Sequence, residues 1–381
     1  MRLNSPAYVL GLLVMAIAVA APSPARSELQ SRRAWASALG GYDSNVRRVS
    51  SDNPPPGLGV EDAARAVLGL GLTATYTAGR FKASLDARPY YIKYSSFAEF
   101  DRADIYGSLP LSYQFADRWF LDVVNTFRTI AYHNRTQWNQ TYNNTVANIR
   151  YRSPSGWNAA AHYRFLYRAN PSPNLDTTTS NGVGASVLVN PSKRLSTGLM
   201  LRYDDEYVDF IFPGGVNANR QWVDVSVRYQ LGSKTIVLGK YLYQRDESDF
   251  PFDSGRDLDK LGEGAEAASD DILQSIRFLE DRDFNYRKHL LVSLFLVRPK
   301  TGHLLEGFLL YQHKTLDQRV LSATAQPRRK DETAIVQASY SKELTEKLRL
   351  FAYARYENVG SNDPDHDFIS FTGGAGLRWT F

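Results

Sequence analysis

The sequence predicts an all-β protein: a transmembrane, antiparallel, up-and-down β-barrel of about 16 strands, within a range of roughly 14–18. Three observations lead to this fold class. Long segments alternate between apolar and polar residues, the connections between these segments are short and long by turns, and the alternation continues to the last residue, Phe381. An even number of strands also predicts that both termini lie on one side, the periplasmic side.

The C-terminal segment 367–381 shows the alternation most clearly. Leu377, Trp379 and Phe381 belong to its apolar row, and Arg378 belongs to the small or polar row. Period-two alternation over about a dozen residues predicts a strand with one apolar face. The segment resembles the terminal strand of bacterial outer-membrane barrels, which often ends in Phe or Trp. The resemblance implies that Leu377, Trp379 and Phe381 form a signal for the barrel-assembly machinery; an edge strand of a β-sandwich is the alternative.

The other segments repeat this pattern. In one of them, Trp157 and Tyr163 alternate with His162 and Arg164. We assign the apolar face to lipid and the polar face to the interior, because a tilted strand of about 9–11 residues crosses the apolar layer. We expect strands at 33–45, 64–77, 80–95, 102–115, 118–132, 139–152, 157–169, 178–190, 194–209, 221–231, 234–247, 285–299, 303–316, 332–342, 347–358 and 367–381.

The connections support the same fold. Ala78-Gly79 and Ala116-Asp117 are tight, whereas 46–63 and 248–284 are long. Short periplasmic turns and longer outward loops are typical of membrane barrels. Pro89 lies inside a predicted strand, and the alternation changes phase after it, which predicts a β-bulge there.

The N-terminal residues 1–27 read as a secretory signal peptide, with Arg2 before an apolar core over 8–20 and small residues before Pro22. We favour cleavage over an uncleaved membrane anchor, because the apolar run is short. The mature barrel then spans 28–381. Together with the terminal strand, the signal predicts the outer membrane of a Gram-negative bacterium, with outer-membrane lipid as its surroundings.

Composition excludes several function classes. The chain has no cysteine, which excludes disulfides and thiol catalysis. Its formal net charge is +5 and its pI about 9.1, yet no basic run carries interleaved aromatic residues, so we expect no nucleic-acid partner. His289 and Ser293 share one strand face without a third partner, and we therefore expect no enzyme activity, no cofactor and no metal.

Many charged residues fall in the polar row that we assign to the interior. Charges at membrane depth are tolerable where they face water or each other. They predict either a hydrated conduit that weakly holds polar or anionic solutes, or a self-neutralising network in a closed lumen. About sixteen strands enclose too wide an interior for side chains alone to fill, which favours the conduit. The basic residues are Arg65, Lys82, Arg88, Arg128, Arg150, Arg164, Arg168, Arg202, Arg228, Lys240, Arg349, Arg355 and Arg378, and the acidic ones Asp86, Asp104, Asp122, Asp204, Asp224 and Glu357.

The long loop 248–284 contains a predicted short helix over 269–279, in which Ile272, Ile276 and Leu279 share a face. Ser269 is a suitable N-cap. The helix either folds into the lumen as a gate or plug, or rests outside as a cap. The sequence leaves both open.

The first strand ends in Gly41-Tyr42-Asp43-Ser44-Asn45-Val46. This stretch is similar to one in exopolysaccharide-associated porins and in the barrel halves of surface-lipoprotein export proteins. The resemblance implies an export conduit for an extracellular polysaccharide, working with a periplasmic polysaccharide-export protein. A passive porin for small polar or anionic solutes and a structural or surface-binding barrel with a plugged lumen are the alternatives. In each case Phe381 should lie beside 33–45, with Arg378 pointing into the lumen.

Overall fold

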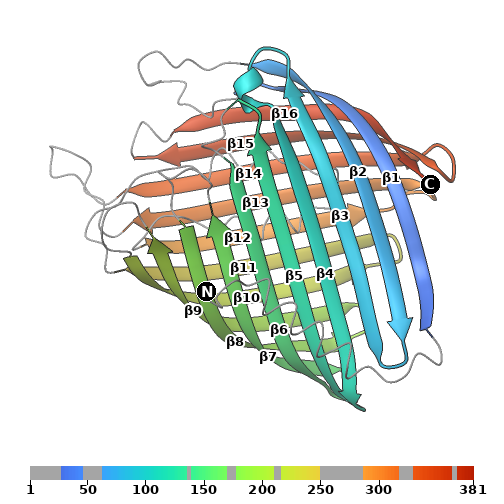
Figure 1. Cartoon of the computed structure of the whole chain (residues 1–381), viewed down its shortest axis with the longest axis vertical. Coiled ribbons are helices and arrows are strands. Elements are labelled where there is room, and N and C mark those ends of the chain that lie inside the picture. The colour runs from blue at the N-terminus through green and yellow to red at the C-terminus, as the bar shows by residue number, and fades with distance from the viewer. Residues whose placement is uncertain are drawn as a thin grey trace, which may run out of the picture.

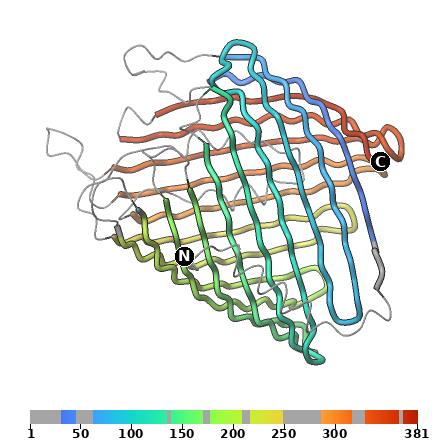
Figure 2. The backbone as a smooth tube through the Cα atoms, viewed as in Figure 1, coloured from blue at the N-terminus to red at the C-terminus, as the bar shows by residue number. Residues whose placement is uncertain are grey.

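Sixteen antiparallel strands close into one barrel, as Figures 1 and 2 show. Each strand pairs with its neighbours in the chain, and β1 pairs with β16, which confirms the predicted fold class. The computed structural model describes residues 27–45, 62–134, 139–169, 177–209, 216–248, 286–316, 329–362 and 367–381. The strands are β1 (Ser27–Asp43), β2 (Ala63–Ala78), β3 (Phe81–Tyr94), β4 (Arg102–Ala116), β5 (Trp119–Tyr132), β6 (Gln140–Arg152), β7 (Trp157–Ala169), β8 (Thr177–Ser192), β9 (Leu195–Asp209), β10 (Val216–Leu231), β11 (Thr235–Ser248), β12 (Tyr286–Val297), β13 (His303–Leu316), β14 (Lys330–Glu343), β15 (Leu348–Ser361) and β16 (Phe368–Thr380).

Two strands begin at least five residues earlier than the alternation predicted. β10 begins at Val216, and β1 begins at Ser27, where it pairs with Ala78 at the end of β2. The pairing of β1 with β2 shifts register between Leu29 and Ser31. The apolar–polar alternation is therefore interrupted at this point, and the sequence pattern does not reveal the first part of β1. Except for its last residue, the predicted signal peptide 1–27 lies outside the described residues.

The barrel closes where the sequence predicted. Trp379 pairs with Ala36, and the backbone N–H of Phe381 donates to the Ala34 carbonyl at 2.8 Å. Phe381 and the 33–45 segment are therefore neighbours. Leu377, Trp379 and Phe381 are exposed, whereas Arg378 is buried and its guanidinium carbon lies 4.5 Å from the centre of the Trp35 ring.

The Gly41–Asn45 stretch builds this seam. A Cβ on Gly41 would lie 2.5 Å from the Gly373 carbonyl oxygen, so the two backbones approach too closely for a side chain. Ser44 accepts from the Phe371 N–H at 2.8 Å, and the Asn45 amide donates to the Ile369 carbonyl at 3.1 Å. These contacts give the stretch a structural role in barrel closure. That role accounts for the presence of these residues without an export function.

The two ends of the barrel differ. Four tight connections turn at glycines with positive φ, at Gly79, Gly156, Gly232 and Gly302, and lie at the end where Phe381 lies. The longer connections lie at the other end, together with the short 3-10 helix η1 (Ala98–Phe100). We refer to these as the short-turn end and the long-loop end. Among the described residues, no helix is long and apolar enough to cross a membrane.

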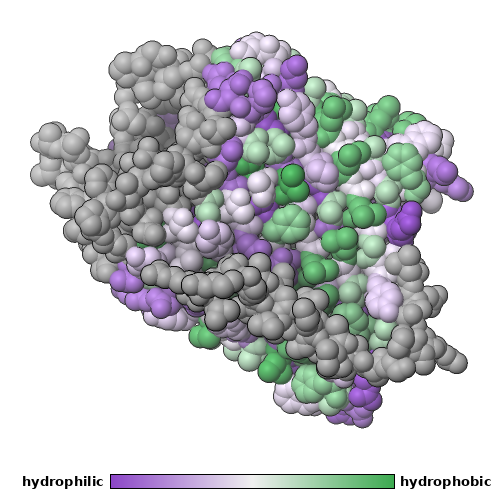
Figure 3. All heavy atoms as spheres, viewed as in Figure 1, coloured by the Kyte–Doolittle hydropathy of each residue, from purple (hydrophilic) through white to green (hydrophobic). Residues whose placement is uncertain are grey.

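The outer surface carries an apolar band between two aromatic groups. Leu68 and Leu70 are more than half exposed on β2, and Figure 3 shows apolar side chains spread over the face that β1–β4 form. At the short-turn end, neighbouring aromatic ring centroids in the series Phe115, Trp119, Tyr151 and Trp157 lie 5.1–6.5 Å apart. At the long-loop end, tyrosine hydroxyls on the outer face bond to neighbouring polar groups, as between Tyr203 and Asn219 at 2.7 Å. An apolar band between aromatic girdles is the surface of a membrane barrel.

The bulge predicted at Pro89 is wrong. Gly69 pairs with Tyr90 and Leu72 with Ala87, so the register between β2 and β3 does not change across Pro89. Tyr90 turns inward and contacts Trp35, with 6.1 Å between ring centroids. Because an inward tyrosine follows the proline, the apolar pattern looks shifted although the backbone is not.

Candidate functional site on the inner wall

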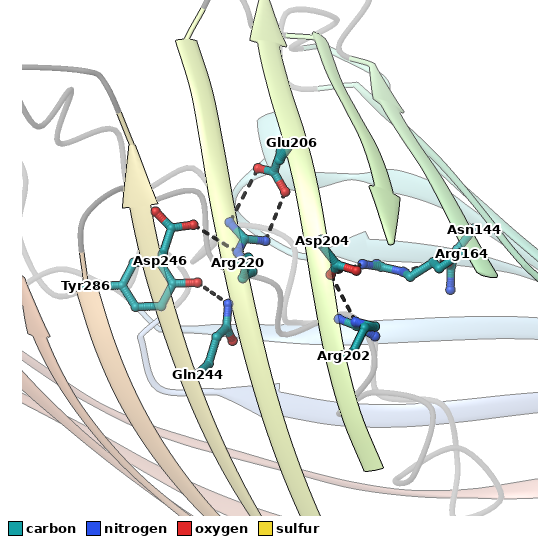
Figure 4. Close-up of polar contacts among 9 residues, drawn as sticks. All are labelled: Asn144, Arg164, Arg202, Asp204, Glu206, Arg220, Gln244, Asp246 and Tyr286. Carbon is teal, nitrogen blue, oxygen red and sulfur yellow. Dashed lines mark hydrogen bonds and ion pairs between the residues drawn. The ribbon is translucent and has the colours of Figure 1, made fainter. Parts of the chain in front are cut away.

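The inner wall carries a buried ion-paired group on β7 and β9, which Figure 4 shows. Asp204 accepts from Arg164 at 3.0 Å and lies 3.0 Å from the guanidinium of Arg202. The side chains of Asp204 and Arg164 are 0% and 2% exposed. Gly182 faces Asp204 across β8 and β9, and a Cβ there would lie 1.9 Å from the carboxylate. The absence of a side chain at Gly182 therefore provides room for the carboxylate.

The Arg202 guanidinium also stacks on an aromatic ring. Its central carbon lies 4.0 Å from the centre of the Trp222 ring, on the strand paired directly with it. A cation over an indole face is favourable, and more so where both groups are shielded from water. Trp222 is 7% exposed, and its indole nitrogen has no hydrogen-bond partner among the residues that the structure describes. One carboxylate and one indole thus hold Arg202 in place on the inner wall.

A second buried group centres on Arg220, which the sequence analysis missed. Its guanidinium lies 3.1 Å from Glu206 and 3.0 Å from Asp246, and its central carbon is 5.9 Å from the Tyr286 ring centre. Gln244 donates to the Tyr286 hydroxyl in the same group, as Figure 4 shows. We missed Arg220 because we began this strand at residue 221. Continuing its alternation by one step, from Trp222 to Arg220, would have found it.

Most of the other predicted charges form pairs within or between neighbouring strands. The separations are 2.5–3.1 Å, the range of charge-assisted hydrogen bonds. The pairs are Arg88–Asp86, Arg128–Asp104, Arg150–Asp122, Lys240–Asp224, Arg355–Glu357 and Arg349–Glu343. Of these partners, the sequence analysis did not name Glu343.

The remaining predicted cations differ in their surroundings. Arg65 donates to the Tyr353 hydroxyl, and Arg168 is buried on β7. Lys82 and Arg228 are exposed in the inward rows of β3 and β10, near the short-turn end. Arg152, which we did not predict, is likewise exposed and lies with its guanidinium carbon 5.0 Å from the Phe120 ring centre.

Part of the inner wall is apolar, contrary to the uniformly polar interior that we expected. Leu290, Val292 and Leu294 of β12 are each less than 5% exposed, while Leu291 on the opposite face is 53% exposed. The middle of β12 is therefore apolar on both faces, and its alternation does not distinguish them. The buried cluster comprises Trp222, Leu242, Leu290, Val292, Leu294, Phe308, Leu310 and Ile335.

Two predicted features stand apart from this wall. The gate or plug residues Ile272, Ile276 and Leu279 lie outside the described residues. His289 lies on the outer face, where its ring nitrogen Nδ1 and the Tyr241 hydroxyl are 2.8 Å apart. Within the described ranges, no group of three His, Cys, Asp or Glu side chains is placed to hold a metal ion.

Comparison with known proteins finds similarity in structure only. No family model and no curated protein matches the sequence. The fold is similar to OccK2 (OpdF) of Pseudomonas aeruginosa, solved in complex with glucuronate, with a TM-score of 0.52, 11% identity, and coverage of 93% of this chain and 98% of that chain. OccAB3 of Acinetobacter baumannii matches with a TM-score of 0.51 and 10% identity, over 92% and 99% of the two chains.

A bacterial polysaccharide outer membrane secretin matches less well, with a TM-score of 0.42 and 10% identity over 91% of this chain and 98% of that chain. A score this low does not support an argument about function. The closed sixteen-strand barrel, its lipid-facing band and the likenesses to OccK2 and OccAB3 agree with one another. The chain is a β-barrel of the Gram-negative outer membrane.

Proposed function

We propose that the barrel is a passive porin for small polar solutes and that it favours anions. The observation that carries this proposal is the set of inward cations near the short-turn end, Lys82, Arg152 and Arg228. All three are exposed, and none has a carboxylate partner among the described residues. Elsewhere on the inner wall, carboxylates neutralise most of the arginines. The unneutralised cations leave a positive potential at one mouth, which raises the local concentration of anions.

Two observations favour this proposal over polysaccharide export. The Gly41–Asn45 stretch on which the export resemblance rests has a structural role at the seam. OccK2, whose fold is similar, was solved with glucuronate, a small sugar carboxylate. We keep export with a periplasmic partner as the second candidate. We also propose that Leu377, Trp379 and Phe381, exposed on the outer face, bind the assembly machinery.

Conductance in planar bilayers tests the proposed function. In a salt gradient, the purified barrel should conduct with a reversal potential that indicates anion preference. Arg152→Gln/Arg228→Gln should shift this potential toward cations. The matched variant Lys93→Gln/Lys342→Gln removes two charges from the outer face and should not shift it. Conductance without ion preference, or an equal shift in both variants, would contradict the anion preference.

A barrel that shows no conductance in this experiment needs a second measurement. We propose that the loop 248–284, through Ile272, Ile276 and Leu279, acts as a gate, which is one of the two arrangements that the sequence leaves open. In that case deletion of the loop opens conductance in a barrel that is otherwise closed. No conductance with or without the loop would rule out a porin and leave the plugged structural barrel. A deletion strain that loses its surface polysaccharide would instead favour export.

A further inference from the structure

Arg102, the first residue of β4, is a buried cation at the long-loop end of the inner wall. It is 3% exposed and shares the inward row of β4 with the buried residues Asp104 and Tyr106. On β5, its guanidinium carbon lies 5.7 Å from the centre of the Tyr132 ring. On β3, it pairs with Ile92, which belongs to a buried apolar cluster. One ring and one apolar side chain therefore flank this charge on the two neighbouring strands.

The Arg102 guanidinium has no carboxylate partner among the residues that the structure describes. Its Nε and Nη2 atoms are buried and have no hydrogen-bond partner. The nearest carboxylates along the chain have other partners. Asp101 accepts from the Tyr94 N–H at 2.8 Å. Asp104 accepts two bonds from Arg128, at 2.9 and 2.6 Å. A buried charge without a partner is costly, because its loss of water is not compensated.

Other arginines that are buried to a similar degree do have a carboxylate beside them. Arg164, Arg220 and Arg329 are 1–2% exposed. Each lies 2.8–3.0 Å from the carboxylate of an aspartate. Arg102 differs from all three, and the group that would complete its surroundings is therefore expected to come from outside the chain.

The two nitrogens without a partner indicate which group this is. Nε and Nη2 lie along one edge of the guanidinium, and such an edge binds a carboxylate through two parallel hydrogen bonds. Three arginines of the barrel use the same two nitrogens in this way, with distances of 2.6–3.2 Å: Arg88 with Asp86, Arg128 with Asp104 and Arg150 with Asp122. The third nitrogen of Arg102, Nη1, is not among the enclosed atoms, and a solute can approach the guanidinium from its side.

We propose that Arg102 binds the carboxylate group of a small organic solute in the lumen. The solute meets Nη1 first, and the guanidinium then turns its Nε/Nη2 edge toward the two carboxylate oxygens. Chloride cannot form this parallel pair of bonds. The inference deepens the proposed function and rests on it only in that solutes enter the lumen. The cations near the short-turn end attract any anion through their potential, whereas Arg102 selects one chemical group.

Saturation-transfer NMR of the full folded barrel in detergent, at constant ionic strength, tests the proposal. The probes are nicotinate and nicotinamide, in which an amide replaces the carboxylate. Nicotinate should bind more tightly than nicotinamide. Arg102→Gln should weaken nicotinate binding by about tenfold or more, because two charge-assisted hydrogen bonds are lost. Arg102→Lys keeps the charge without the planar fork and should recover only part of the affinity.

Lys93→Gln is the matched control, since Lys93 is an exposed cation on the outer face of β3, the strand next to β4. It should leave nicotinate binding unchanged. Urea unfolding without nicotinate is an independent measurement. Arg102→Gln should not lower the unfolding midpoint, because it removes a charge that has no partner.

Three outcomes would each overturn the proposal: equal binding of the two probes, an equal loss of binding in Lys93→Gln, or a lower unfolding midpoint in Arg102→Gln. Arg102→Lys keeps the binding test available if Arg102→Gln does not fold. A reversal potential that indicates anions, without nicotinate binding, would overturn this inference and leave the proposed function intact. Nicotinate binding by a barrel that does not conduct would support this inference and contradict the proposed function.

Discussion

Two parts of the inner wall are both buried, but different interactions stabilise their side chains. The first, which we refer to as the polar sector, consists of Arg164, Arg202, Asp204, Glu206, Arg220 and Asp246. The second, the apolar sector, is the cluster around Leu290, Val292 and Phe308. In both sectors the central side chains are only a few per cent exposed. Buried charges need partners of fixed geometry, whereas buried apolar groups need only volume and contact.

Trp222 joins the two sectors. It belongs to the apolar cluster, and its ring also lies under the Arg202 guanidinium. On one strand, β10, the inward row therefore passes from Arg220 through Trp222 to Asp224. The boundary between the two sectors therefore lies within single strands. On the polar side stability is most sensitive to the loss of a charge partner, and on the apolar side to the loss of buried volume.

The largest effect is expected in the polar sector, for Asp204→Asn. The change keeps the shape of the side chain but leaves the guanidinium groups of Arg164 and Arg202 without the charge that lies between them. Breaking a buried ion pair costs roughly 3–5 kcal/mol, because the remaining charge is not compensated. Urea unfolding of the barrel in lipid vesicles, followed by tryptophan fluorescence, measures the loss.

Asp86→Asn is the matched control for this comparison. Asp86 and Arg88 also form an ion pair, at 2.7 Å, but their side chains are 20% and 12% exposed. Solvent screening reduces the contribution of such a pair. A loss as large as that of Asp204→Asn would show that burial does not distinguish the two pairs.

A smaller loss is expected in the apolar sector, for Leu290→Ala. Leu290 is 1% exposed, and a buried Leu→Ala change costs about 2–5 kcal/mol, depending on how far the cavity collapses. We expect the lower part of this range because neighbours in the cluster can move into the space. Leu291→Ala, on the lipid-facing side of the same strand, should cost less. If both cost the same, Leu290 would not belong to a packed cluster.

The sequence predicted the fold and the polar sector better than the apolar sector, for a physical reason. Strict alternation identified the strands and placed Arg164, Arg202 and Asp204 in one polar row. It could not specify which carboxylate meets which arginine, because pairing depends on register between strands. In β12 the residues Leu290 and Leu291 are both apolar, so period two carries no information about which one faces the lumen. The bulge expected at Pro89 was wrong for a similar reason, since aromatic residues occupy both faces there.

The smallest effect on stability is expected at the border of the two sectors, for Lys240→Met. The Lys240 ammonium lies 2.5 Å from Asp224 and is 36% exposed, and Lys240 pairs across the sheet with Val292 of the apolar sector. A half-solvated ion pair contributes about 0–1 kcal/mol, and methionine extends the apolar sector by one residue of similar length. The free energy of unfolding should therefore change little. The reversal potential should still move toward cations, because one inward positive charge is lost beside Asp224. Lys240→Arg should restore it. A loss of stability comparable to that of Asp204→Asn, with no change in ion preference, would place Lys240 in the polar sector as a structural ion pair.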